Sequence, residues 1–417
     1  MRILFLSPSG GLGGAERCLV DLIASIRAHD ASIEVGVLTG GEGPLLSEVE
    51  SLGAQVLRLP LAQGLAAVGD SGLATGTFRA VASTGRRLAI GALHAARYAA
   101  QLRAAMHRFA PSVIHSNGIK MHLLAAAAGS PAPLVWHLRD FIGQRPLVPV
   151  GMRALGWRAA AGIAISEAVG EDARRVLRRP DVHVVYDAID TELFAPAGPV
   201  ASLDALAGAA IVPERCVRVG LVATYARWKG HDVLLQAARH LATLPALPEA
   251  SQVVFYIVGG PIYDTTASQY SREELGAMAS ALGVTERVRF VPFQARVEEV
   301  FRALDVVIHA SSRREPFGRT IAEGMASGKP VIVANGSGAA ELFADGRDAV
   351  GVPPCDPEAL AEAVHRLALD PAERARLGRM GRATAVARFS RARLAREVFD
   401  VYRAAGERTR GTARAAI

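Results

Sequence analysis

Three segments of this 417-residue chain have residue types and spacings that suit a phosphorylated, hydroxyl-rich ligand. The first is the glycine-rich turn SPSGGLGGAER at 7–17, between an apolar run and a helical pattern. Glycines let the backbone approach a phosphate, and a helix N-terminus offers free N–H groups. Glu16 replaces the third glycine of a dinucleotide motif, and Lys329 is followed by Pro330 rather than the hydroxyl residue of a P-loop. The turn therefore predicts a general anion site, with a purely structural turn as the alternative.

The second segment, TYARWKG at 224–230, follows the strand-like run 217–222 and carries two cations, Arg227 and Lys229. Cations at this place suit a diphosphate leaving group, whose developing negative charge must be stabilised. The chain has 44 arginines and only three lysines, so a lysine here draws attention. The alternative interpretation is a solvated loop lysine, and for Lys329 we adopt that interpretation.

The third segment is EPFGRTIAE at 315–323, where we expect Glu315 before a helix and Glu323 two turns inside it. If the whole stretch were helical, the two carboxylates would lie ~12 Å apart along the axis. A glycosidase acid/base pair needs ~5–10 Å. The spacing instead suits two carboxylates that bind hydroxyls at different points of one extended ligand, with the amides of 317–319 facing its phosphates.

Four polar residues near predicted strand ends in the first half are further candidates: Asn117, Lys120, His137 and Arg139. His137 and Arg139 are two residues apart and share one side of an extended strand. We expect Arg139 to contact a donor phosphate or an acceptor, whereas His137 suits an acceptor site and a buried core equally. Lys120 suits either an acceptor contact or the start of a surface helix.

Short apolar runs alternate with helical segments along most of the chain, which predicts parallel sheets covered by helices. The pattern restarts after the weakly charged stretch 195–210, so we expect an α/β protein with two Rossmann-like, doubly wound domains that face a cleft. The predicted parts are an acceptor-side domain, a donor-side domain and a C-terminal helix that packs back on the first domain: 1–198, 199–387 and 388–417. Ligands of such sheets bind beyond the carboxyl ends of the strands.

The net charge of +7 is concentrated in one segment, because 71–139 carries eight basic residues and no acidic one. Its helical part, from about Thr77 to Arg108, suits either a solvated helix face or peripheral contact with anionic lipid on the inner face of a membrane. We expect no nucleic-acid partner, because the segment has few aromatic residues for base stacking. Three widely spaced cysteines, the lack of a secretory signal and the lack of a long apolar run predict a cytoplasmic protein without a spanning helix.

These segments together resemble the retaining nucleotide-sugar glycosyltransferases of glycosyltransferase family 4, which have the GT-B fold. The resemblance extends over nearly the whole chain. Its most specific part is the Glu-x₇-Glu element with the AEGMASGKPV that follows it. The other matching segments are GGAE at 13–16, AISEAV at 164–169, VVYDAIDTELF at 184–194, PVIVANGSGAAELFADG at 330–346 and VPPCDPEALA at 352–361.

The resemblance implies roles for individual residues. Glu323 would bind the ribose hydroxyls of the donor, Glu315 hydroxyls of the transferred sugar, and Lys229 the diphosphate. The catalytic set would be Glu315, Lys229 and Arg139. The remaining donor-binding residues would be Gly13, Gly14, Thr224, Arg227, Gly259, Phe293, Pro316, Phe317, Gly318, Arg319 and Thr320. Family members react by front-face displacement without a dedicated protein base, so we expect neither a cofactor nor a metal ion.

The chain departs from the family pattern at three places. Thr224 stands where an arginine is usual, and Arg227 is the candidate to replace it. Arg139 stands where a histidine is usual, and Asp187-Ala188 replaces Asn-Gly, which we interpret as a structural turn variant. Two alternative functions therefore stay open beside transfer of a sugar to a glycan, lipid-linked or small-molecule acceptor. They are a sugar-nucleotide epimerase or phosphorylase of the same fold, and a non-catalytic sugar-nucleotide-binding protein.

Overall fold

The structure is a computed structural model that describes residues 1–61, 81–145, 147–178, 181–213, 215–247, 252–261 and 268–415. Two compact units organise the chain: unit 1 comprises Met1–Ala188 and Arg391–Ile417, and unit 2 comprises Ile189–Ser390. The predicted bounds placed residues 189–198 in the first domain and residues 388–390 with the C-terminal helix, whereas both segments belong to unit 2.

Seven parallel strands form the sheet of unit 1, in the order β3-β2-β1-β4-β5-β6-β7. Their bounds are β1 Arg2–Ser7, β2 Glu34–Thr39, β3 Gln55–Arg58, β4 Val113–Asn117, β5 Leu134–Leu138, β6 Ala161–Ala164 and β7 Val182–Val184. All but β7 overlap the short apolar runs predicted as strands, at 3–6, 33–38, 56–59, 113–114, 134–136 and 163–165, since a strand buried on both faces needs a continuous apolar sequence. The strand order reverses between β1 and β4, so the glycine turn after β1 and Asn117 at the end of β4 lie at the switch point.

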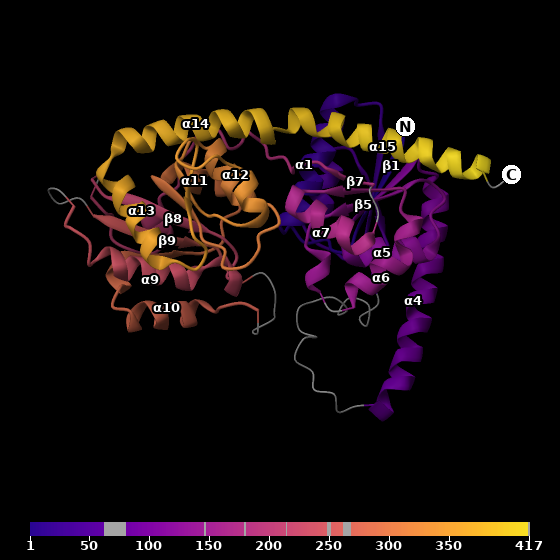
Figure 1. The fold of residues 1–417 in the computed structure, drawn as a ribbon, viewed down its shortest axis with the longest axis horizontal. Helices are drawn as coiled ribbons and strands as arrows, with labels where there is room; N and C mark the ends of the chain where they lie inside the picture. The colour runs from indigo at the N-terminus through magenta and orange to yellow at the C-terminus, as the bar shows by residue number, and fades with distance from the viewer. Residues whose placement is uncertain are drawn as a thin grey trace. The chain divides into compact units, whose positions relative to one another are not determined.

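Helices cover both faces of this sheet (Figure 1). They are α1 Gly14–His29, α2 Leu45–Ser51, α4 Val81–Phe109, α5 Ile119–Ala128, α6 Val148–Leu155, α7 Glu167–Leu177 and α15 Arg391–Ala415. The helix predicted from Thr77 begins outside the described residues, and α4 is described from Val81 onward. Although α15 follows unit 2 in the chain, it packs on α1, and Leu394 and Val398 share a core with Ile3 and Phe5.

Six parallel strands form the sheet of unit 2, in the order β10-β9-β8-β11-β12-β13. Their bounds are β8 Val217–Val222, β9 Val253–Val258, β10 Val288–Val291, β11 Val306–His309, β12 Val331–Ala334 and β13 Val350–Val352. The strand order reverses between β8 and β11. The loops after these two strands carry Lys229 and Glu315, so both predicted segments lie at the switch point of this sheet. Two doubly wound parallel sheets confirm the predicted fold class.

The helices of unit 2 are α8 Leu203–Leu206, α9 His231–Leu241, α10 Arg272–Ala281, α11 Val297–Ala303, α12 Arg319–Ala326, α13 Pro357–Leu369 and α14 Pro371–Phe389. The weakly charged stretch 195–210, after which the pattern was predicted to restart, contains α8 and is bound to unit 2. Arg302 donates hydrogen bonds to the carbonyl oxygens of Ala195, at 2.8 Å, and Pro199, at 3.1 Å. Arg382 donates to the carbonyl of Thr191 at 2.6 Å. These two arginines fix the start of unit 2 to its own core.

Candidate active site

The carboxylate of Glu315 lies in the loop between β11 and α12, beyond the carboxyl end of β11. Three side chains donate hydrogen bonds to its Oε2 atom: Lys229 Nζ at 2.7 Å, Ser311 Oγ at 2.8 Å and His309 Nε2 at 3.2 Å. Within the described residues, none donates a hydrogen bond to its other oxygen, Oε1. A carboxylate has about four acceptor positions, so Oε1 remains open to a ligand hydroxyl.

Glu315 stays ionised across the neutral range. Burial alone would raise its pKa, but the Lys229 ammonium and the hydrogen bond from His309 outweigh burial and hold the pKa well below its ordinary value. The pair is partly shielded, because the side chains of Lys229 and Glu315 are 25% and 12% exposed. Such a carboxylate is a permanent hydrogen-bond acceptor and is unsuited to donate a proton.

Gly230 explains how Lys229 reaches a carboxylate 86 positions away in the chain. Its φ of 77° is left-handed, and a Cβ atom there would lie 1.9 Å from the carbonyl oxygen of Ala310. Only glycine combines this backbone conformation with so close an approach. The loop after β8 therefore closes onto the residue that follows β11, which places the ammonium beside Glu315.

Glu323 lies on α12, and Arg319 Nε donates a hydrogen bond to its Oε1 atom at 2.6 Å. Both side chains are largely buried. The helix begins at Arg319, with Gly318 in a left-handed conformation at its N-cap. Glu323 is therefore one turn inside the helix, and the prediction of two turns was wrong. The ~12 Å spacing does not apply either, because residues 315–318 are not helical.

The remaining residues of this loop anchor it or stay accessible. Phe317 is buried, with its ring edge-on to that of Phe389 at 5.7 Å between centroids. Pro316 and Thr320 are partly exposed. Because the Phe317 side chain packs inward, its backbone is what the segment offers to a phosphate at the start of α12.

Arg227 is engaged within unit 2. Its guanidinium donates a hydrogen bond to Glu274 on α10 at 2.8 Å and lies 4.4 Å from the ring centroid of Tyr270. Thr224, where the family usually has an arginine, is partly buried at the start of the same loop. Replacement of the family arginine by Arg227 would require Arg227 to share or leave its contacts with α10.

Gly259 and Phe293, both predicted to bind the donor, follow strands β9 and β10. Gly259 has φ of 146°, and a Cβ atom there would lie 2.0 Å from the carbonyl oxygen of Ala223. This tight approach joins the end of β9 to the loop that carries Thr224. The Phe293 ring is exposed, as befits a surface on which a flat ring could stack.

The glycine turn of unit 1 ends at the N-terminus of α1. Gly13 is the N-cap and supplies no side-chain bond to the first turn, and the space above Gly14 is open. Burial raises the pKa of Glu16 in that turn, and the backbone hydrogen bonds and Arg139 that oppose it do not cancel the effect. Gly13 has no side chain with which to cap α1, and the Glu16 carboxylate accepts backbone hydrogen bonds from Gly13 and from Glu16 itself, so a phosphate bound at this predicted anion site would compete with Glu16.

Arg139 is buried rather than presented to a ligand, with its side chain 8% exposed. Nη1 donates to both oxygens of Asp187, at 2.6 and 2.9 Å, and Nε donates to Asn117 Oδ1. Cys18 Sγ donates to Asp187 at 3.2 Å. The structure therefore brings Arg139 and Asn117 together, while Lys120 lies in the first turn of α5.

His137 belongs to a buried chain of hydrogen bonds. Its Nδ1 atom lies 3.3 Å from Arg139 Nη2 and 2.9 Å from His115 Nε2, and His115 Nδ1 lies 2.7 Å from the hydroxyl of Tyr402 on α15. A guanidinium only donates, so His137 Nδ1 accepts, His115 Nε2 carries a proton, and Tyr402 donates to His115 Nδ1. Burial, with Arg139 as the next cause, lowers the pKa of both histidines well below the ordinary value. Both rings are neutral, and each has a defined tautomer.

Six contributors to these clusters were not recognised as such in the sequence: Cys18, His115, Asp187, His309, Ser311 and Tyr402. His309 and Ser311 gave a usable signal, because they directly follow an apolar strand run and precede Glu315. Asp187 was interpreted as a turn variant only. Tyr402 carried no signal, since its partner is almost three hundred positions away, with a separation of 287.

No metal-binding cluster of three His, Cys, Asp or Glu side chains occurs among the residues that the structure describes. None of the three cysteines forms a disulfide; Cys18 and Cys216 are buried and Cys355 is exposed. None of the helices in the described ranges combines the length and apolarity that crossing a membrane requires.

Two protein-family models match the chain. The model described as Glycosyltransferase Family 4 matches residues 12–193, and the model described as Glycosyl transferases group 1 matches residues 213–384. The first match covers unit 1 from α1 to β7, without β1 and α15, and extends into the first residues of unit 2, and the second covers the sheet of unit 2 with the Lys229 and Glu315 loops.

Characterised relatives and solved structures have related names. A D-inositol 3-phosphate glycosyltransferase of Streptomyces bingchenggensis is 34% identical over 227 residues, which are 53% of this chain and 47% of the relative. The chain thus spans about half the length of this relative. An alpha-maltose-1-phosphate synthase of Mycobacterium tuberculosis is 29% identical, over 70% of this chain and 79% of the synthase. Anabaena HepE in complex with UDP superposes with a TM-score of 0.75 at 26% identity, over 96% of this chain and 99% of HepE.

Proposed function

Because this chain belongs to glycosyltransferase family 4 and has the GT-B fold, we propose that it is a retaining glycosyltransferase (EC 2.4). It moves a hexose-type sugar from a nucleoside diphosphate to a hydroxyl of an acceptor. The observation that carries the proposal is the arrangement around Glu315, where three donors fix one oxygen and the other stays open.

Each donor-binding residue contacts a different part of the nucleotide sugar. Oε1 of Glu315 accepts hydrogen bonds from hydroxyls of the transferred sugar. Lys229 has three N–H donors and uses one on Glu315, so two remain for the diphosphate. Glu323, oriented by Arg319, accepts hydrogen bonds from the ribose hydroxyls. The amides of Gly13 and Gly14 bind donor phosphate.

The reaction exchanges one C–O bond at the anomeric carbon for another on the same face of the sugar. The bond to the diphosphate breaks, the acceptor oxygen attacks from the same side, and a donor phosphate oxygen takes the acceptor proton. The ionised Glu315 donates no proton. Lys229 and the N-terminus of α12 stabilise the departing diphosphate, so the proposal requires no metal ion and no cofactor.

A UDP-hexose is the first donor to test. HepE, the solved structure described above, was crystallised with UDP and also with UDP-glucose, the latter at 25% identity and a TM-score of 0.76. The acceptor is a glycan, a lipid-linked molecule or a small molecule and binds on the unit 1 side. We further propose a cytoplasmic location with peripheral membrane contact through the basic segment 71–139, of which residues 71–80 lie outside the described ranges.

The test begins with a panel of nucleotide sugars screened by thermal shift, since a ligand of the folded state raises its apparent stability. The stabilising donor is then incubated with and without acceptors, and the anomeric configuration of the product is determined by NMR. Retention of configuration together with acceptor-dependent release of nucleotide is the expected result.

Two other outcomes would assign a different function. Conversion of the nucleotide sugar without any acceptor would identify an epimerase. Tight donor binding without turnover, across a broad acceptor panel, would identify a binding protein. A Glu323→Ala variant serves as the internal check: it should fold normally and lose turnover, and full activity would remove the ribose role.

A further inference from the structure

Unit 1 exposes an apolar stripe on α6 and the helical turn that follows it. Leu147 at the N-cap is 83% exposed, Val150 is 66% exposed and Trp157 is 71% exposed. Ala154, also exposed, lies between Val150 and Trp157. Successive members are three or four residues apart, so they share one face of the helix. We name these four residues the α6 stripe.

The α6 stripe faces outward although the same helix also has a buried side. Met152 is fully buried and Leu155 partly buried, and they attach α6 to the unit. The core is therefore satisfied without the stripe. Leu147 also has a left-handed backbone, with φ of 64°, and its side chain is nevertheless exposed rather than buried in the core. Adjoining large apolar side chains at this exposure on one short helix are typical of an interaction site.

Cations accompany the stripe. Arg158 lies over the Trp157 ring at 4.9 Å from its centroid, and Arg153 is exposed on the same helix. From residue 81 to residue 166 the sequence has one acidic residue, Asp140, and that carboxylate is paired with Arg145. α7, which packs on α6, adds three carboxylates (Glu167, Glu171 and Asp172) and, with the residue after it, three arginines (Arg174, Arg175 and Arg178), so the net positive charge around the stripe comes from residues 81–166.

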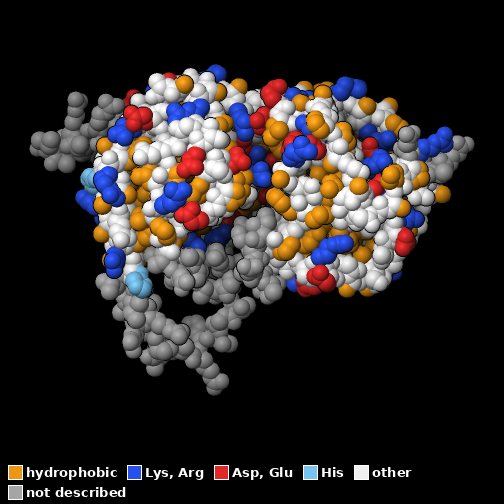
Figure 2. Space-filling view, turned by 180° about the vertical axis from the view of Figure 1, so that it is seen from behind, with side chains coloured by type: hydrophobic (Ala, Val, Ile, Leu, Met, Phe, Trp, Pro, Cys, Tyr) orange, Lys and Arg blue, Asp and Glu red, His pale blue; other side chains and the backbone are white. Residues whose placement is uncertain are grey.

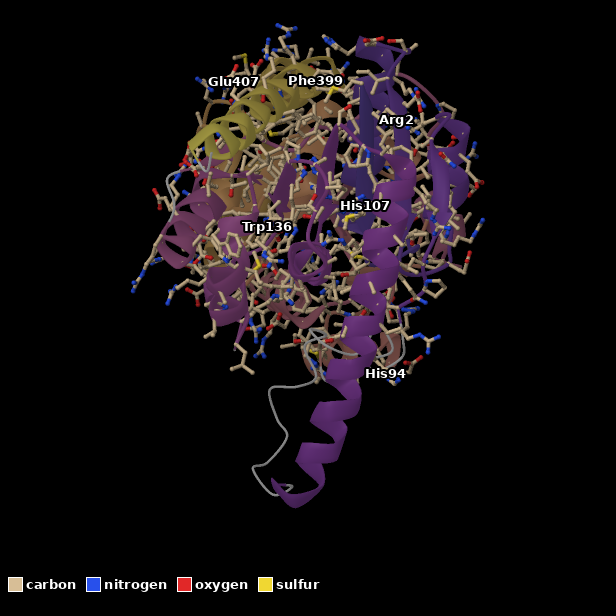
Figure 3. The ribbon with its side chains drawn as sticks, turned by 90° about the vertical axis from the view of Figure 1, so that its right-hand side faces the viewer. Arg2, His94, His107, Trp136, Phe399 and Glu407 are labelled. Carbon is tan, nitrogen blue, oxygen red and sulfur yellow. The ribbon has the colours of Figure 1, made fainter. Side chains whose placement is uncertain are left out.

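The neighbouring helices extend this basic surface. α5 packs between α6 and α4 (Figure 1). Along α4, Arg97 and Arg108 are exposed, and His94 and His107 are spaced along the same helix (Figure 3). In Figure 2, basic and histidine side chains line the margin of unit 1 that α4 forms. An anionic surface with an apolar interior complements the exposed apolar side chains of the α6 stripe and the basic side chains near it.

We propose that the α6 stripe inserts into the interface of a bilayer that contains anionic lipids. Leucine, valine and tryptophan enter the headgroup–acyl boundary, where tryptophan is favoured, while Arg153 and Arg158 stay at headgroup level. Basic residues near the surface add attraction that salt screens. This contact goes beyond the proposed sugar transfer and is independent of it. It also differs from the predicted contact through 71–139, because its main contribution is apolar burial.

The test is cosedimentation of the full chain with vesicles of phosphatidylcholine with and without phosphatidylglycerol. The wild type should pellet with the anionic vesicles at low salt. Val150→Ser and Trp157→Ser should each weaken binding by about tenfold, and the double variant by about a hundredfold, because each removes apolar burial. Ile211→Ser is the matched control: Ile211 is as exposed as Leu147, at 83%, but lies in unit 2. This variant should bind like the wild type.

Tryptophan emission gives a second measurement. The chain has three tryptophans, of which Trp136 is buried and Trp157 is the most exposed. Anionic vesicles should shift the wild-type emission to the blue. Trp157→Phe should keep binding to the vesicles and lose most of that shift.

The proposal is overturned if the double variant pellets like the wild type, or if the wild type does not bind anionic vesicles at low salt. Concentration-dependent dimerisation that the double variant abolishes, without vesicle binding by the wild type, would assign the stripe to a second copy of the chain. Because donor turnover is measured without vesicles, failure of this proposal is distinguishable from failure of the proposed transferase function.

Discussion

The charged clusters of the two units use the same kinds of side chain and differ in what they leave unpaired. Around Glu315 in unit 2, three donors converge on one oxygen and the other stays open. Around Arg139 in unit 1, Asp187 takes the charge in a bidentate contact, and Asn117 takes a further donor. A buried charge whose hydrogen-bond partners all come from the protein mainly stabilises the structure. A charge with an unused acceptor position can bind a substrate. The two clusters should therefore respond differently to substitution.

The largest effect on stability is expected in unit 1. Asp187→Asn leaves the buried guanidinium of Arg139 without a counter-charge, which costs about 3–5 kcal/mol. Calorimetry should show a lower melting temperature. Replacement of both residues, in Arg139→Met with Asp187→Leu, should recover much of the loss because no unpaired charge remains. An Asp187→Asn variant of full stability that lacks turnover would reverse the comparison and give Arg139 a role in catalysis.

The largest effect on turnover is expected in unit 2. Glu315→Gln keeps the shape of the side chain and removes the charge, so kcat/KM should fall by about 10²–10³. The melting temperature should also fall, because the variant loses the carboxylate that Lys229 and His309 stabilise, but by less than in Asp187→Asn, since the Lys229–Glu315 pair is partly exposed. Glu362→Gln, an exposed position on α13, is the control and should match the wild type in both measurements. A Glu315→Gln variant with normal kcat/KM would contradict the role of Oε1.

A smaller, pH-dependent effect should follow removal of Lys229. Its ammonium lowers the pKa of Glu315 against burial, so Lys229→Met raises that pKa. Residual activity needs the ionised carboxylate, and its acid limb should therefore move to higher pH. The fold also becomes less stable at low pH. A carboxyl group whose pKa is lower in the folded state stabilises the fold at pH values above its unfolded pKa, and this stabilisation is lost as the pH falls through the folded pKa. Lys229→Arg keeps the cation and should keep the acid limb, and an unshifted Lys229→Met profile would contradict the coupling.

The smallest effect is expected at the far end of the unit 1 hydrogen-bond chain. Tyr402→Phe removes the donor to His115 and should cost ~1 kcal/mol of stability. Tyr98→Phe is a matched control, because the Tyr98 hydroxyl is also engaged in unit 1, with the carbonyl oxygen of Leu59 at 3.1 Å. Both variants should keep turnover within about twofold, in line with a structural role. A loss of turnover in Tyr402→Phe alone would show that the chain of histidines positions groups for the reaction.

The sequence predicted the strands of both sheets except for one edge strand in each. Runs such as Val217–Val222 and Val253–Val258 are continuous apolar segments, and burial on both faces makes such runs unmistakable. The edge strands β7 and β13 have three residues each and were not predicted, whereas β3 and β10, at the opposite edges, coincide with apolar runs. An edge strand pairs on one side only and needs neither length nor continuous apolarity.

In the site, residue types were predictable and their pairing was not. Lys229 and Glu315 stood out by scarcity and motif, but their contact depends on Gly230 closing onto Ala310, a long-range approach. Arg139 was expected to face a ligand and is buried instead. Its environment is set by Asp187, 48 positions further on. Local patterns carry no information about which distant carboxylate neutralises a given arginine.

The origin of unit 1 from two separate pieces of chain has a consequence for biosynthesis. Its core needs Leu394 and Val398 of α15, whereas unit 2 is one continuous segment. A ribosome adds about 5–20 residues per second, so roughly 10–40 s pass between synthesis of Ala188 and Arg391. Unit 2 is synthesised during that interval, while the nascent first half has an incomplete apolar face. We therefore expect unit 1 to depend on chaperones until α15 emerges.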